Sequence, residues 1–250
     1  MSQFVQRFGL IVLLALLSGP VALAQEAEPP ASCPGCSLPE AQYKRQNLAG
    51  ADFSKAVLTG AIFHRAVLTG ADFAGANLAE ANLNKTSATQ ADFTGADLTN
   101  VLFYESDGGK AHFDRAIMRG AKMQGARVFG AIFDGADMSE AFLMGTRFDG
   151  ASLKGTVLER SNMTDAVFSQ ANLEGARLAN SGLLNARLRG TNLRNADLSG
   201  ADLYRADLTD ADLTGANLSG ARLSLAHTNG AIFDGADLTG TYMPDGSLHD

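Results

Sequence analysis

The 250-residue chain has few of the residue types from which enzyme active sites and metal centres are built. It has two cysteines and only four histidines, and the histidines are scattered: His64, His112, His227 and His249. It contains no HExxH motif, no phosphate-binding glycine loop and no Ser-His-Asp arrangement. The sequence therefore predicts a protein that is not an enzyme and that binds no cofactor or metal.

The two cysteines form the sequence CPGC at Cys33–Cys36. A haem attachment site requires a histidine after the second cysteine, where this chain has Ser37. A tetrahedral metal site lacks two further ligands nearby, and a thioredoxin-like redox site lacks its βαβ context. In an oxidising compartment the pair predicts a small disulfide between Cys33 and Cys36 that closes the N-terminal end. Free thiols and redox or metal chemistry are the alternatives.

The chain also lacks an apolar run long enough to span a membrane. The run Phe8–Leu17 is about half of the roughly 20 apolar residues that a bilayer requires. Arg7 precedes the run, and the small-x-small sequence ALA at 22–24 follows it, as in a secretory signal. We expect residues 1–24 to be a cleaved signal peptide and no membrane span to remain afterwards. The mature protein is then periplasmic or secreted.

What the chain has in abundance is a repeat of five residues. The repeat is clearest at 196–220, which reads ADLSG ADLYR ADLTD ADLTG ANLSG. The third residue of each unit, called the centre below, can be followed in steps of five from Cys33 to Met243 without a slip. Nearly all centres from Leu48 onwards are Leu, Phe or Met, and Ala usually stands two residues before the centre.

A period of five fits neither the 3.6 residues of an α-helix nor the continued alternation of a long strand. Within one unit, however, the Ala and the centre stand two residues apart, as neighbours on one face of an extended segment do. Glycine and polar residues that favour turns gather at the last two positions. Each unit therefore predicts a short strand followed by a corner.

These ADLxx and ANLxx units resemble the pentapeptide repeat family over nearly the whole chain that follows the signal. The resemblance implies an all-β fold: a right-handed quadrilateral parallel β-helix, or solenoid, with four units per coil and the centre and the Ala inside. About ten coils would be roughly 48 Å long at about 4.8 Å per coil. We expect a linker and N-terminal cap at 25–45, the β-helix at 46–245 and a C-terminal tail at 246–250.

A coil of twenty residues places every fourth centre in one column, and the sequence supports this arrangement. The three centres that are not large and apolar, Ala88, Gly108 and Thr228, fall in one column. Where one wall is small, the other walls carry Phe or Met, as a dense interior requires. The predicted structural core includes Phe53, Phe73, Phe93, Phe113, Phe133, Leu198, Leu203, Leu208 and Leu213.

The segment Tyr104–His112 matches the repeat worst and predicts a local bulge. It reads YESDGGKAH and contains acidic, basic and histidine side chains close together in sequence: Glu105, Asp107, Lys110 and His112. Gly108 within it permits unusual backbone angles, so we interpret the segment as a distorted surface corner. A binding or catalytic site is the alternative interpretation.

Outward second positions carry two clusters of charge, which we interpret as solvated faces with pairing across coils. Partner surfaces are the alternative interpretation of both. One cluster is an acidic collar around nearly one coil, formed by Asp197, Asp202, Asp207 and Asp212. The other is a stack of arginines on one wall, formed by Arg127, Arg147 and Arg187. Family members with acidic surfaces resemble duplex DNA in shape and charge and bind DNA gyrase, so the resemblance implies an alternative function as a DNA-mimic regulator of a type II topoisomerase. The expected export and the arginines argue against this alternative and against nucleic acid as a partner.

The repeat stops after Met243, at the sequence PDG, without an amphipathic helix to cover the last coil. A β-helix that ends in this way exposes unpaired strand edge and core. Phe233, Leu238 and Met243, together with Thr228, are therefore candidates for a homodimer through the C-terminal end, as in some relatives. The function that we expect is a non-enzymatic exported scaffold that binds an unidentified protein or an envelope component.

Overall fold

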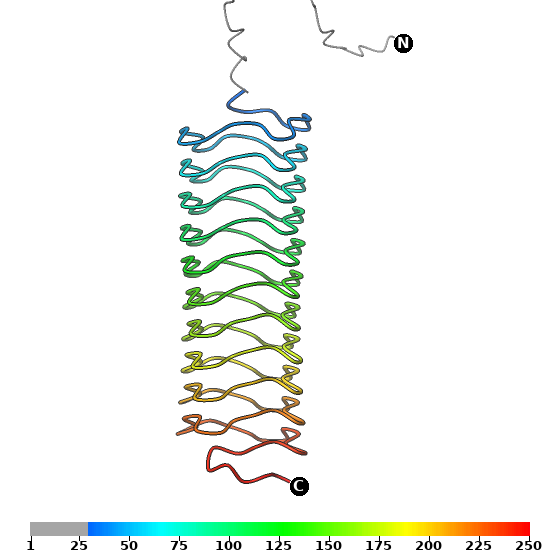
Figure 1. Ribbon diagram of the computed structural model, residues 1–250, viewed down its shortest axis with the longest axis vertical. Coiled ribbons are helices and arrows are strands. Elements are labelled where there is room, and N and C mark those ends of the chain that lie inside the picture. Colours follow the sequence, from blue (N-terminus) through cyan, green and yellow to red (C-terminus); the bar gives the residue numbers. More distant parts are fainter. Residues whose placement is uncertain (1–29) are drawn as a thin grey trace, which may run out of the picture.

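The computed structural model describes residues 30–250 as one regular coil wound around a single core (Figure 1). The predicted signal peptide at 1–24 lies outside these residues. Parallel β-bridges join residues twenty apart, from Ser37–Val57 at one end to Arg222–Tyr242 at the other. Four units of five therefore make one coil, and the coils stack into a column. The ladder already includes residues 37–45, which the sequence assigned to the linker and N-terminal cap.

Single bridge residues take the place of longer strands. The second residue of each unit forms the bridge, and the fourth and fifth residues form a turn. Residues 30–250 thus contain no continuous strand and no helix. No helix in that range is long and apolar enough to cross a membrane. The corner predicted at the last two positions of each unit is present.

The same backbone hydrogen bonds recur in each unit. In the unit Ala56–Gly60, the N–H of Val57 donates to the Cys36 carbonyl of the preceding coil at 2.7 Å. The N–H of Leu58 donates to the Asn77 carbonyl of the following coil, also at 2.7 Å. The fifth N–H donates to the following coil too, and the first N–H donates to the centre carbonyl of the unit before it. Backbone groups that would otherwise be buried without partners are paired in this way.

The corners place the fifth residue of each unit in the left-handed region. From Gly35 to Gly240, φ at this position lies between 52° and 72°. Glycine occupies about half of these positions, because it adopts positive φ without a Cβ clash. The others include Arg45 and Arg65, which adopt this conformation less readily. The ladder on either side therefore holds the corner in place even where glycine is absent.

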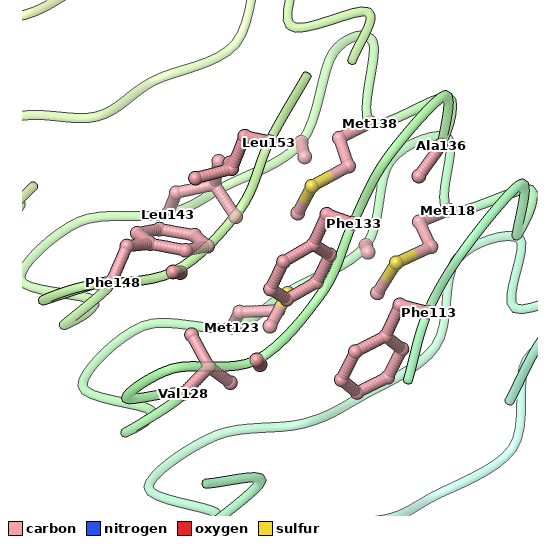
Figure 2. Packing of buried hydrophobic residues seen from close by; sticks show 14 of the residues in the cluster. Phe113, Met118, Met123, Val128, Phe133, Ala136, Met138, Leu143, Phe148 and Leu153 are labelled. Carbon is pink, nitrogen blue, oxygen red and sulfur yellow. The ribbon is translucent and has the colours of Figure 1, made fainter. Parts of the chain in front are cut away.

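The first and third residues of each unit fill the axis of the coil. The nine residues of the predicted core are each at most 1% exposed: Phe53, Phe73, Phe93, Phe113, Phe133, Leu198, Leu203, Leu208 and Leu213. The five phenylalanines stack along one column with ring centroids 4.7–5.3 Å apart. Figure 2 shows Phe113 and Phe133 in this stack, with Met118 and Met138 beside them. Aromatic stacking adds to the free energy of burial.

Serine and threonine replace alanine at some of the inward first positions without leaving a hydroxyl unpaired. Thr146 Oγ1 donates to the Met123 carbonyl at 2.7 Å, and Thr156 Oγ1 donates to the Phe133 carbonyl at 2.8 Å. The eight buried residues of this kind, each with a backbone acceptor, are Thr86, Ser106, Thr146, Thr156, Ser161, Ser181, Thr191 and Thr241. Burial of these polar groups is tolerated because each hydroxyl is hydrogen-bonded.

The segment Tyr104–His112 does not form the predicted bulge. Asp107 bridges the coils on both sides of it in register. Gly108 is an inward centre, and a Cβ there would lie 3.2 Å from Val128 Cγ1 and 3.3 Å from Phe103 Cζ. The bulge prediction is wrong because neighbouring side chains, rather than the backbone, take up the missing volume.

The C-terminal tail turns back onto the last coil. Tyr242 pairs with Leu248 in an antiparallel bridge. Gly240 N–H donates to the His249 carbonyl at 2.8 Å, and His249 N–H donates to the Thr241 carbonyl at 2.9 Å. The expectation that nothing covers the last coil is therefore wrong for this part of it. Backbone pairing by the tail provides the cover without a helix.

The inward assignment predicts the behaviour of variants at Leu208. Leu208→Asp is expected to prevent folding of the coils around it, because an unpaired carboxylate in the axis costs several kcal/mol. Leu208→Ala, which leaves a cavity, should cost about 2–5 kcal/mol. Thermal unfolding followed by circular dichroism measures both, with Ser224→Asp at an outward corner as the control. An unchanged melting temperature in Leu208→Asp contradicts the assignment.

Candidate interaction surfaces

The carboxylates of the acidic collar first of all complete the corners of the coil. Each collar Oδ1 accepts a hydrogen bond from the N–H two residues further on, at 2.9–3.1 Å: Asp197 from Ser199, Asp202 from Tyr204, Asp207 from Thr209 and Asp212 from Thr214. This fourth N–H is the one that the backbone ladder leaves free. Asp or Asn at the second position supplies its acceptor, as in other turns capped by these side chains.

Hydrogen bonds keep two of the collar carboxyls ionised. The Thr214 hydroxyl and then the Thr214 N–H lower the pKa of Asp212 below its ordinary value, and Arg194 adds to the effect. Burial raises the pKa of Asp207, but hydrogen bonds from the Thr209 hydroxyl and N–H outweigh burial and lower it overall. These carboxylates are therefore negative at neutral pH and lose their charge only in acid.

Arginines neutralise part of the collar. Asp202 accepts two hydrogen bonds from Arg222, from Nε at 2.8 Å and from Nη2 at 2.7 Å. Asp212 accepts one from Arg194 Nη1 at 3.0 Å. Exposed pairs of this kind contribute only about 0–1 kcal/mol each, yet they interrupt the negative surface. The collar is therefore not a continuous row of free carboxylates.

The three arginines of the predicted partner surface lie in one column of the ladder, with Val167 between Arg147 and Arg187. Arg127 Nη2 lies 3.5 Å from Asp107 Oδ2, and Arg147 Nε lies 3.3 Å from Asp149 Oδ2. The Arg147 guanidinium also lies over the Phe129 ring, 4.6 Å from its centroid. Arg187 forms a parallel backbone β-bridge with Asp207 of the collar and therefore lies next to it in the same column. This wall therefore carries both signs of charge, and its role in partner binding stays a prediction.

The acid, base and histidine group of Tyr104–His112 is dispersed over different partners. Glu105 lies 3.2 Å from Lys85, Asp107 faces the arginine column, and His112 Nδ1 lies 3.4 Å from Asp114 Oδ2. Within residues 30–250, no three His, Cys, Asp or Glu side chains come together in a way that could hold a metal ion. The structure does not assemble this group into one site.

The structure contains a charged cleft of about 280 Å³ that the sequence analysis missed. Three ion pairs line it: Arg119–Asp137 at 2.6 Å, Arg160–Glu140 at 2.9 Å and Arg177–Glu159 at 2.5 Å. The partners come from neighbouring coils, so pairing of outward positions eighteen to twenty residues apart was the signal that could have revealed it. Its charges compensate one another, and the cleft therefore has no net charge to attract an ion.

The two cysteines lie at the N-terminal end of the column, half-buried, as thiols. Burial, with the Cys33 thiol beside it, raises the pKa of Cys36 to about 12. A thiol that stays protonated is a poor nucleophile and a poor metal ligand. Burial also raises the pKa of Tyr43 to about 12, and its hydroxyl donates to the Pro30 carbonyl at 2.9 Å. The predicted disulfide stays a prediction.

The C-terminal coil leaves part of its core open. Phe233, Leu238 and Met243 are half-buried, whereas Leu213 and Leu218, one coil earlier in the columns of the first two, are fully buried. The tail pairs with the segment 240–243 and not with the walls that carry Phe233 and Leu238. The candidate dimer end therefore presents apolar surface at the point where stacking stops.

The same end has backbone donors that the ladder does not use. In earlier coils each centre N–H donates to the following coil, but the N–H groups of Thr228, Phe233 and Leu238 find no backbone acceptor within residues 30–250. Four large apolar side chains around this end are 45–55% exposed: Leu225, Ile232, Tyr242 and Leu248. Free donors next to apolar surface are the features of an unpaired sheet edge, which readily pairs with another chain.

Three sequence models of the same repeat match the chain one after another. The model described as "Pentapeptide repeat region" matches residues 36–113. "Pentapeptide repeats (9 copies)" matches 110–157, and "Pentapeptide repeats (8 copies)" matches four overlapping segments within 141–245. Together the matches cover nearly all of the coil. No curated protein matches the sequence.

Several solved structures are similar to this chain. HetL, a pentapeptide repeat protein involved in heterocyst differentiation regulation in Nostoc sp. strain PCC 7120, is 28% identical; the match covers 86% of this chain and 92% of HetL, with a TM-score of 0.42. Full-length QnrB1, a plasmid-mediated fluoroquinolone resistance protein, is 18% identical over 84% and 87%, with a TM-score of 0.41. A thylakoid-lumen pentapeptide repeat protein from Arabidopsis thaliana is 35% identical over 43% and 68%, with a TM-score of 0.28.

The corner hydrogen bond of Asp212 predicts a difference between two variants. Asp212→Ala should lower the free energy of unfolding by about 0.5–1 kcal/mol, because the Thr214 N–H loses its acceptor. Asp212→Asn should retain most of the stability, since Asn217 accepts the equivalent bond from Ser219 at 3.0 Å. Urea unfolding at neutral pH measures both. Equal losses in the two variants would argue against the corner role.

The lowered pKa of Asp212 also predicts a pH dependence. Its folded pKa lies below the ordinary value of 3.8, so the carboxylate contributes stability above about pH 4 that is lost as the pH falls through the folded pKa. The stability of the wild type relative to Asp212→Asn should therefore decrease in acid. Unfolding measured at neutral pH and at about pH 2 tests this, and a constant difference would refute it.

Proposed function

This chain belongs to the pentapeptide repeat family, and from that premise we propose that it is a non-enzymatic exported scaffold that presents its walls and its C-terminal end to protein or envelope partners. We include in the proposal that the coil is a right-handed quadrilateral β-helix of about ten turns. A stacked coil of this kind is stiff and repetitive, and it displays side chains at fixed spacing. Such a body suits binding and mechanical roles.

The contrast between the last coil and the rest of the column carries the protein-binding part of the proposal. From Tyr43 to Leu223 the centres are buried and their N–H groups donate to the following coil, whereas Phe233 and Leu238 are half-buried and their N–H groups have no backbone acceptor in the described chain. A second copy placed against this end would cover the apolar side chains. A symmetric contact of this kind closes as a dimer.

Export is the part of the proposal that rests on the sequence. Arg7, the apolar run Phe8–Leu17 and the small residues at 22–24 have the order of a secretory signal. An oxidising compartment also suits a bonded Cys33–Cys36 pair. We therefore propose a periplasmic or secreted location, with residues 1–24 removed.

The charges of the collar favour a scaffold over a DNA mimic. A protein that imitates duplex DNA requires a long and continuous negative surface. Here Asp202 pairs with Arg222 and Asp212 pairs with Arg194. The arginine column interrupts the negative surface on a further wall. The topoisomerase regulator therefore stays the alternative function.

Self-association through the C-terminal end has a direct test. We expect the full chain to have the mass of a dimer in multi-angle light scattering as its concentration rises. Phe233→Glu with Leu238→Glu should give a monomer, because charges at the contact oppose its burial. The matched control is Phe142→Glu, an exposed apolar residue in the middle of a wall, which should leave the dimer intact. A wild type that is monomeric over a broad concentration range contradicts the proposal.

Export is tested by the fate of the first 24 residues. We expect them to carry a fused reporter out of the cytoplasm, and the exported chain to begin at Gln25 in N-terminal sequencing. The reporter alone, without residues 1–24, is the control. If the uncleaved chain stays in the cytoplasm, the export proposal is wrong. The main argument against the alternative function, regulation of a topoisomerase, is then removed.

A further inference from the structure

Five cationic and titratable side chains gather on one corner at the N-terminal end of the column. They occupy the fourth and fifth positions of three successive coils and form what we call the basic ridge: Lys44, Arg45, His64, Arg65 and Lys85. The coils are in register here, since Arg45 N–H donates to the His64 carbonyl at 3.0 Å and Arg65 N–H donates to the Asn84 carbonyl at 2.9 Å. The side chains are therefore stacked at about the 4.8 Å spacing of neighbouring strands.

The charge of the basic ridge is largely uncompensated. Within residues 30–250, the one ion pair that a member forms is Lys85–Glu105 at 3.2 Å. At other corners some cations pair with acids on neighbouring coils, as Arg160 does with Glu140, and others, such as Lys110 and Arg115, form no ion pair within residues 30–250. The ridge differs from them because its cations are stacked on successive coils. Like charges held this close repel one another. Burial, and after it the charges of the four neighbouring cations, lower the pKa of His64, in agreement with a positive potential at the ridge.

The corner itself gives no reason for cations at these positions. Arg45, Arg65 and Lys85 have φ of 62°, 61° and 58°, a conformation that glycine adopts more easily and that glycine occupies in about half of the corners. Arg and Lys here thus combine backbone strain with mutual repulsion. A negatively charged partner would offset the repulsion.

The ridge lies at the opposite end of the column from the most acidic part of the chain (Figure 1). The whole chain has a net charge of −7, and residues 197–250 alone carry nine acidic and two basic side chains. Residues 30–107, which include the ridge, carry eight acidic and five basic side chains, so the ridge is a local cluster of cations at the less acidic end of the column. Near a negatively charged surface, the more acidic C-terminal end is repelled more strongly and turns away from it.

Apolar side chains flank the ridge. Val67, on the wall that follows it, is 38% exposed. Ile62, on the wall before it, is partly exposed. Cations next to exposed aliphatic side chains match the boundary between headgroups and acyl chains, where both kinds of contact are available. Duplex nucleic acid would offer partners to the cations but not to the aliphatic side chains.

We propose that the basic ridge docks the column on a surface of anionic lipids, with Lys44, Arg45, Arg65 and Lys85 on the phosphate headgroups and the C-terminal end pointing away. The lipid surface is a partner class for the envelope role and rests on the proposed function. Docking leaves the candidate dimer end free for another copy or another protein. Lipid binding by the purified chain can nevertheless be measured whether or not the chain is exported.

Vesicle sedimentation of the full chain tests the proposal, with phosphatidylcholine vesicles compared with vesicles that also contain phosphatidylglycerol. The wild type should bind the anionic vesicles, and salt should weaken the binding because it screens exposed charges. Each Lys or Arg at a lipid surface contributes about fivefold to binding. The triple variant Lys44→Gln, Arg45→Gln, Arg65→Gln should therefore lose on the order of 100-fold.

A matched triple variant separates the ridge from net charge. Lys110→Gln, Arg115→Gln, Lys154→Gln removes three exposed cations from other corners, and it should bind anionic vesicles as the wild type does. If the ridge triple variant does not fold, Arg45→Gln alone should still show about a fivefold loss. Thermal melting of each variant identifies loss of fold.

Three results would overturn the lipid assignment. One is a wild type that binds neutral and anionic vesicles equally or neither of them. Another is an equal loss of binding in the two triple variants, since net charge and not the ridge would then be responsible. The third is tighter binding of a duplex DNA oligonucleotide than of vesicles at equal phosphate concentration. Any of these leaves the export and dimer tests unaffected, so the two proposals fail separately.

Discussion

The structure depends on one interaction, the backbone hydrogen bond between coils that joins each centre N–H before the last coil to a carbonyl nineteen residues further along. Leu58 with Asn77 and Leu198 with Asn217 are examples at opposite ends of the column, each at 2.7 Å. This bond fixes the register, and the register places every twentieth residue in one column. The aromatic stack, the corners and the charged surfaces all follow from that placement.

Residues that act within one unit could be predicted from the sequence, and residues that act between coils mostly could not. The sequence assigns Phe53 and Leu208 to the core because each is a large apolar residue two positions after an Ala, on the same face of a short extended segment. The bulge at Gly108 was wrong because Phe103 and Val128, from other units, fill its space. The turn-back of the tail depends on backbone pairing between Tyr242 and Leu248, which side-chain pattern does not reveal.

The outward side chains show the same division. The sequence located the collar aspartates and indicated pairing across coils, but it did not reveal their bonds to the corner N–H groups, because those bonds depend on the geometry of the turn. Much of the collar charge is compensated by ion pairs on the surface of the same chain, as in the pair of Asp202 with Arg222. The two ends differ from the walls in this respect. Within the described chain only one cation of the basic ridge, Lys85, forms an ion pair, and Phe233 at the other end lacks a coil to cover it. We therefore place the interaction surfaces at the ends of the column.

Native-state hydrogen exchange at individual amides tests the ladder most directly. We expect slow exchange at the first, second, third and fifth residues of each unit between the two end coils, because these N–H groups are bonded within or between coils. The fourth amide should be slow where a side-chain oxygen accepts from it, as at Thr214, which donates to Asp212, and at Tyr104, which donates to Asn84 of the preceding coil. It should be fast at Ser224, which follows Arg222. Protection without a period of five, or equal protection at Thr214 and Ser224, would contradict the hydrogen-bond ladder described for the coil.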